Sequence, residues 1–143
     1  MDERTERRIL DKARYVRDAV TVLAEKRDGL SFEEYRESRE QRDVVEREFE
    51  TAIEACIDIG ELLLKATETG VPETNAAVFR ALGREGVLSD ELATRMAQAA
   101  GFRNVLSHQY GDEIDDRDVY NFLQHDLPLF RSYLQAVRAV LKR

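Results

Sequence analysis

The sequence predicts an all-α protein, an up-and-down bundle of four to five substantial helices joined by short loops. Apolar residues recur at steps of three and four along almost the whole chain, which is the period of a helix packed on one face. No run alternates with a period of two, so no strand is expected. With 143 residues, 7 glycines and 2 prolines, the chain suits a single domain, residues 1–143, with few linkers.

The first helix is predicted from one apolar stripe. Its members step by four, three, four and three, and they are Ile9, Ala13, Val16, Val20 and Leu23. The pair Asp28-Gly29 ends this helix. A short helical turn is expected next, because Ser31 and Glu34 form a capping-box pattern.

A longer helix follows from a second stripe with the same spacing. The stripe consists of Val45, Phe49, Ala52, Cys56, Ile59 and Leu63. Most of the charged residues between them, including Glu50 and Glu54, are expected on the other face. The segment Gly70-Val71-Pro72 is expected to close the helix. Cys56 is the only cysteine, which excludes an internal disulfide, and its place in the stripe predicts a small buried hydrophobe.

The second half of the chain continues the helical pattern in shorter pieces. A short segment over 75–83 directs its apolar residues to the core, and a helix capped by Ser89 or Asp90 follows it. That helix is expected to run to Tyr110-Gly111-Asp112.

Two further helices complete the bundle. Asp115 or Asp116 caps the first of them. Pro128 interrupts the pattern, and Asp126 is placed to cap a restart. The apolar face of the final helix consists of Phe130, Leu134, Val137 and Leu141.

Composition and charge limit the function classes. Acidic residues number 29 against 22 basic ones, a net charge of −7, and this balance does not favour nucleic acid as a partner. No stretch approaches the ~18 apolar residues of a membrane span, and the charged N-terminus lacks the apolar centre of a signal peptide. The protein is therefore expected in the cytoplasm, with no membrane partner.

The two histidines differ in their surroundings. His125 lies near the end of a predicted helix, where the helix dipole favours a structural role. His108 lies in a polar helix end that also carries Arg103 and Asn104. Arginine binds phosphate oxygens and histidine moves protons near neutral pH, so the pair suits phosphodiester chemistry. The alternative is a capping histidine beside an exposed arginine, and the residue types alone favour that alternative.

Helical geometry adds a difficulty to the catalytic interpretation. At ~100° per residue, Asn104 and His108 lie ~40° apart on one face, whereas Arg103 and His108 lie ~140° apart. A regular helix therefore does not direct Arg103 and His108 at one atom. For both groups to reach one phosphate, the Arg103 side chain must bend back around the helix, the last helical turn must unwind, or two chains must line a shared cleft.

An acidic cluster over 112–116 invites comparison with a metal site. The residues of this cluster lack the alternating oxygen ligands and the central glycine of a calcium-binding loop, since Arg117 comes directly after the cluster. Helix capping and a solvated loop explain the cluster better. No metal site and no cofactor are expected.

The pattern Arg103-x-x-x-x-His108-x-Tyr110 resembles the signature of the HEPN superfamily, and the surrounding phrase is similar to its HepT-like branch. Other parts of the chain carry the same resemblance, from about Ser31 onward. They are residues 53–59 in the long helix, 78–88 in the middle segment and 126–130 at the start of the last helix.

The resemblance implies a HEPN-like helical fold and a metal-independent endoribonuclease that acts as the toxin of a toxin–antitoxin pair. HEPN nucleases work as homodimers whose two motifs meet in one cleft, which would answer the geometric difficulty. Arg103 and His108 would be catalytic, with attack by the ribose 2′-hydroxyl of the RNA substrate leaving a cyclic phosphate. Asn104 would orient the imidazole or contact phosphate.

The resemblance also implies a partner protein. In the HepT-like branch this partner is a nucleotidyltransferase antitoxin, called MNT, which is understood to silence the toxin by adenylylation of the motif tyrosine, here Tyr110. An anionic adenylate beside Arg103 would compete with substrate phosphate.

Two other functions are weighed against the ribonuclease. One is a non-catalytic HEPN protein that serves as the substrate-binding subunit of a nucleotidyltransferase complex. The other is a structural bundle that only dimerises.

Overall fold

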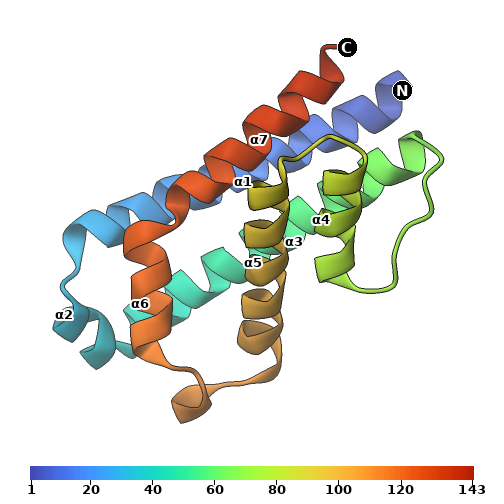
Figure 1. Ribbon diagram of the computed structural model, residues 1–143. Helices are drawn as coiled ribbons and strands as arrows, with labels where there is room; N and C mark the ends of the chain where they lie inside the picture. The colour runs from blue at the N-terminus through green and yellow to red at the C-terminus, as the bar shows by residue number, and fades with distance from the viewer.

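The computed structural model describes the backbone of residues 1–143 and every side chain except that of Asp112. Over this backbone the chain forms seven α-helices and one 3-10 turn, with no strand (Figure 1). They are α1 (Glu3–Gly29), α2 (Phe32–Glu37), α3 (Arg39–Ala66), α4 (Asn75–Arg84), α5 (Asp90–His108), η1 (Gly111–Glu113), α6 (Asp116–His125) and α7 (Leu127–Leu141). The all-helical prediction is confirmed; the difference from four to five helices lies in the short α2, α4 and α6. None of the helices so described is long and apolar enough to span a membrane.

Hydrogen bonds from side-chain caps explain where α2, α5 and α6 begin. Ser31 and Glu34 form the predicted capping box at the start of α2. Ser89 caps α5 by accepting from the backbone N–H of Leu92 at 3.2 Å, and Asp115 caps α6. Of the alternatives that the sequence left open, Ser89 and Asp115 are therefore the caps.

The start of α7 differs from the expectation. Asp126 occupies the cap position, but its side chain makes no capping hydrogen bond. Pro128 has no N–H to donate, and the N–H of Leu129 bonds the backbone carbonyl of Asp126 at 3.0 Å. The carboxylate instead accepts from Arg95 Nη2 of α5 at 2.6 Å. Asp126 therefore joins two helices rather than capping one.

Two helices end earlier than the sequence indicates. α3 ends at Ala66 rather than at Gly70, because the N–H groups of the next residues already bond its last carbonyls, including Thr69 N–H to Leu64 O at 3.0 Å. α5 ends at His108: the N–H of Gln109 still bonds the Val105 carbonyl at 2.9 Å, but the backbone of Gln109 is extended and leaves the helix.

α3 is the centre of the core. All members of its predicted apolar stripe are buried, and the helix packs against α1, α4 and α5. Burial raises the pKa of the Cys56 thiol, as its predicted place in the core requires. At Gly60 an added Cβ would lie 2.7 Å from Cγ1 of Val78, so glycine here allows α4 to approach α3 closely.

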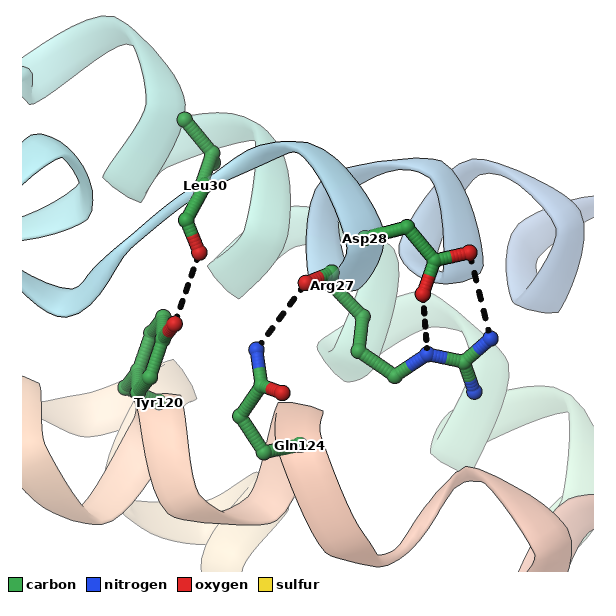
Figure 2. A network of polar contacts seen from close by, with 5 residues as sticks. All are labelled: Arg27, Asp28, Leu30, Tyr120 and Gln124. Carbon is green, nitrogen blue, oxygen red and sulfur yellow. Dashed lines mark hydrogen bonds and ion pairs between the residues drawn. The ribbon is translucent and has the colours of Figure 1, made fainter.

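α6 is fixed to the end of α1 by side chains that bond orphan carbonyls of that helix (Figure 2). The Tyr120 hydroxyl donates to the Leu30 carbonyl at 2.6 Å, and Gln124 Nε2 donates to the Arg27 carbonyl at 3.0 Å. Arg27 pairs at the surface with its neighbour Asp28 at 2.9 Å. These contacts hold α6 in place beside α5, whose end it supports.

Two buried tyrosines provide a matched test of the core. The hydroxyl of Tyr133 donates to the Cys56 carbonyl at 2.8 Å, whereas the hydroxyl of Tyr35 has no hydrogen-bond partner among the described residues. Tyr133→Phe is expected to lower the free energy of unfolding by about 1–2 kcal/mol, since a buried carbonyl loses its donor. Tyr35→Phe is expected to leave it unchanged or to raise it. Urea denaturation measures both, and equal losses would contradict the assignment.

Candidate active site

The end of α5 carries the residues that the sequence analysis singled out, and apolar side chains fix its position. Leu106 is buried. Phe102 packs between Phe49 of α3 and Phe122 of α6, with ring centroids 5.8 and 4.8 Å apart. Because these contacts hold one side of the helix, the opposite side of residues 101–108 faces solvent.

Arg103 lies on the packed side of α5 and reaches α3. Its Nη2 lies 2.8 Å from Oε2 of Glu54, and the two side chains are 22% and 44% exposed. Its Nε is buried and has no hydrogen-bond partner among the residues that the structure describes. The carboxylate therefore anchors the guanidinium at one nitrogen, and because the side chain is partly exposed, a guanidinium donor other than the buried Nε remains for an anionic ligand.

A second polar contact joins α5 to α3 one helical turn away. The hydroxyl of Ser107 donates to Oε2 of Glu50 at 2.8 Å. Glu50 and Glu54 are four residues apart on α3, and Arg103 and Ser107 are four residues apart on α5, so each pair shares a helix face. Together the two contacts set the rotation of α5 about its own axis, and hence the direction of Arg103.

The other motif residues lie on the solvent side. Asn104 and His108, the last residue of α5, are exposed, and Tyr110 is 77% exposed. Within the described part of the chain, no hydrogen bond or ion pair engages these three side chains. An imidazole so placed can exchange a proton with a bound ligand.

The structure does not bring Arg103 and His108 together within one chain. α5 is an α-helix through His108, so its last turn does not loosen. Arg103 is directed at α3, and His108 lies ~140° further round the helix. One chain therefore presents the Arg103 guanidinium and the His108 imidazole in different directions.

Sequence reasoning missed the two carboxylates that orient this region. Glu50 and Glu54 were expected among the charges of the outer face of the long helix, whereas both contact α5. Their spacing of four residues, matched by the spacing of Arg103 and Ser107, was the available signal. It identifies partners only once α3 and α5 are known to be neighbours.

The acidic segment before α6 has the predicted structural role. Asp115 accepts from the backbone N–H groups of Arg117 at 2.9 Å and Asp118 at 3.3 Å. The side chain of Asp112 lies outside the described residues. Among the side chains that are described, no cluster of three or more His, Cys, Asp or Glu residues is placed to hold a metal ion.

Comparison with known proteins matches most of the chain to one family. The family model described as "Ribonuclease HepT-like" matches residues 15–137, which includes most of α1 as well as the later segments. A tRNA nuclease HepT of Aphanizomenon flos-aquae is 32% identical over 114 residues, 80% of this chain and 77% of that protein. An mRNA nuclease HepT of Shewanella oneidensis is 27% identical over 86 residues, 60% of this chain and 64% of that protein.

Solved structures agree on the fold. A tri-AMPylated HEPN toxin of Shewanella oneidensis, in complex with its MNT antitoxin, superposes with a TM-score of 0.85 at 20% identity. The match covers 97% of this chain and 99% of that chain. The helical arrangement described here is therefore that of a known HEPN protein over nearly its whole length.

Proposed function

We propose that this chain, which belongs to the HepT-like ribonuclease family, is an endoribonuclease toxin whose active site is shared by two copies. One observation carries the proposal: α5 presents an anchored arginine and an exposed histidine in different directions. An RNA phosphodiester needs both groups at one phosphate.

The reaction uses the nucleophile that RNA itself carries. The ribose 2′-oxygen forms a bond to the adjacent phosphorus, and the bond from phosphorus to the 5′-oxygen of the next nucleotide breaks. One proton leaves the 2′-hydroxyl and another reaches the departing 5′-oxygen, giving a cyclic phosphate and a 5′-hydroxyl. His108 serves as general acid or base, and Arg103 stabilises the charge that develops on phosphate oxygens. No metal-activated water is required.

A homodimer supplies the missing geometry. A two-fold axis places the same surface of each copy against the other, so the α5 end of one copy faces the α5 end of its partner. Each copy then contributes one Arg103 and one His108 to a common cleft. Two histidines also allow one to act as base and the other as acid. Asn104, on the same face as His108, orients the imidazole or contacts phosphate.

A paired substrate experiment tests the proposed reaction. In excess EDTA, an RNA oligonucleotide is expected to be cut to products that end in a cyclic phosphate, while the 2′-deoxy oligonucleotide of the same sequence stays intact. Mass spectrometry of the products measures both. Cutting of the 2′-deoxy strand, or loss of cutting in EDTA, would contradict 2′-hydroxyl attack. Binding of RNA without cleavage would favour the substrate-binding subunit instead.

The partner that we propose is an MNT nucleotidyltransferase antitoxin, which adenylylates Tyr110. The hydroxyl of Tyr110 is exposed for such a reaction, and the similar Shewanella oneidensis toxin is AMPylated in complex with its MNT antitoxin. The added phosphate is an anion two residues from His108, in the shared cleft, where it pairs with Arg103 of the other copy and competes with RNA phosphate.

Tyr15, which is 48% exposed, is a matched control for the modification of Tyr110. After incubation with the antitoxin and ATP, wild type and Tyr15→Phe are expected to gain adenylate mass and lose nuclease activity. Tyr110→Phe is expected to gain none and to stay active. Intact mass and RNA cleavage measure the two effects. Modification of Tyr110→Phe to the same extent as wild type would place the acceptor elsewhere.

A further inference from the structure

A groove lies between α1 and α7, away from the end of α5. The two helices run antiparallel with both chain termini at the same end (Figure 1). The space between them has a volume of about 370 Å³. Its lining is mostly aliphatic and includes Leu10, which is 46% exposed. The lining residues belong to α1 and α7 alone, so the groove is separate from the motif on α5.

The groove includes three predicted core positions that the fold leaves partly uncovered. The apolar stripes of the first and last helices predicted that Val20, Leu134 and Leu141 would be buried. In the structure all three are only partly buried, and they line the groove, whereas their stripe neighbours Val16 and Val137 are buried. Apolar side chains that a stripe would bury but the chain does not cover are typical of a binding surface.

The charge around this groove is unlike that of the whole chain. The net charge of the protein is −7, yet Arg17, Arg131 and Arg138 line the groove and no Asp or Glu is among its lining residues. None of the three arginines has an ion-pair partner within the described residues. An apolar floor with three unpaired guanidinium groups is complementary to an apolar surface flanked by carboxylates.

The dimensions of the groove fit one short helix. Its lining spans Ile9–Thr21 on α1 and Phe130–Leu141 on α7, which is about 17–18 Å on each side. That length corresponds to about three turns of a third helix. We propose that the groove binds an amphipathic helix of a partner protein, with aliphatic residues on one face and Asp or Glu residues beside them.

Two other occupants fit the groove less well. An RNA strand would meet an aliphatic floor whose one aromatic ring, that of Phe130, is fully buried and cannot stack on a base. A second copy related by a two-fold axis would bring the three arginines of one chain toward the same three of the other. The inference goes beyond the proposed nuclease activity and does not depend on it.

Two synthetic helical peptides of three turns test the groove. Both carry the same Leu residues at positions i, i+3 and i+7, one with Glu and the other with Lys at the flanking positions. Fluorescence anisotropy of each labelled peptide is measured with the full-length protein. The Glu peptide is expected to bind about tenfold tighter or more. The preference is expected to reverse in the triple variant Arg17→Glu, Arg131→Glu, Arg138→Glu, and Leu134→Asp is expected to abolish binding.

A second triple variant controls for net charge. Arg47, Arg80 and Arg84 are exposed and lie outside the groove, so their change to Glu alters the net charge by the same amount. This variant is expected to keep the preference for the Glu peptide. The inference is overturned if wild type binds neither peptide or both equally, or if the control triple also reverses the preference. Loss of RNA binding in the groove triple variant alone would identify RNA as the occupant. A smaller oligomer in Leu134→Asp alone would identify a second copy of the chain as the occupant. Circular dichroism checks that each variant is folded.

Discussion

Replacement of His108 by alanine is expected to slow RNA cleavage by about 10²- to 10⁴-fold, the range that general acid–base catalysis contributes. The expected effect on folding is small, because His108 is exposed at the last position of α5 and makes no polar contact with the described residues. The cleavage rate of an RNA oligonucleotide under single-turnover conditions measures the first effect. Urea denaturation measures the second.

His125 provides the control for this experiment. It is also exposed and is also the last residue of a helix, α6, so the two histidines share the same helix-end position. His125→Ala is expected to cleave RNA at the wild-type rate. If His108→Ala cleaves as fast as His125→Ala, then His108 is only a helix-end residue, and another group must move the proton.

Much of the fold could be predicted because local signals fix it. The stripe on α3 and the caps Ser31, Ser89 and Asp115 depend on residues within one or two turns. The stripe and Ser31 lie where the pattern placed them, and Ser89 and Asp115 are each one of the two residues that the pattern offered. Asp126 differs because its partner, Arg95, is 31 residues away in the sequence. A local rule assigns that carboxylate to the nearest helix start, whereas the folded chain offers it a charged donor from another helix.

The residues of the candidate site could be predicted from the sequence, but the contacts between helices that orient them could not. The spacing of the motif on one helix gives the angle between Arg103 and His108 without any structure. The direction of Arg103, in contrast, depends on Glu54, and that contact exists only because α3 and α5 pack together. The same limit applies to Leu134 and Leu141: the stripe predicts which face is apolar, and only the packed helices show that the face is incompletely covered.

A mixed dimer of two impaired variants is expected to regain RNA cleavage. Arg103→Ala alone is expected to lose about 10²- to 10³-fold in rate, because a preorganised donor to the phosphate oxygens is removed. His108→Ala alone is expected to be slowed by about 10²- to 10⁴-fold for the reason given above. A mixed dimer keeps His108 in one copy and Arg103 in the other, so one complete pair can meet at the shared cleft. Differently tagged copies, co-expressed and purified through both tags, provide this mixed dimer for the cleavage assay.

The control dimer combines wild type with the double variant Arg103→Ala, His108→Ala. It also contains one arginine and one histidine, but both come from the same copy. If the shared cleft pairs Arg103 of one copy with His108 of the other, the mixed single variants cleave RNA faster than this control. If the control is faster, both groups act from one chain. That result would require the Arg103 guanidinium to leave Glu54 and turn through ~140° around α5, against the contacts that hold it on the packed side.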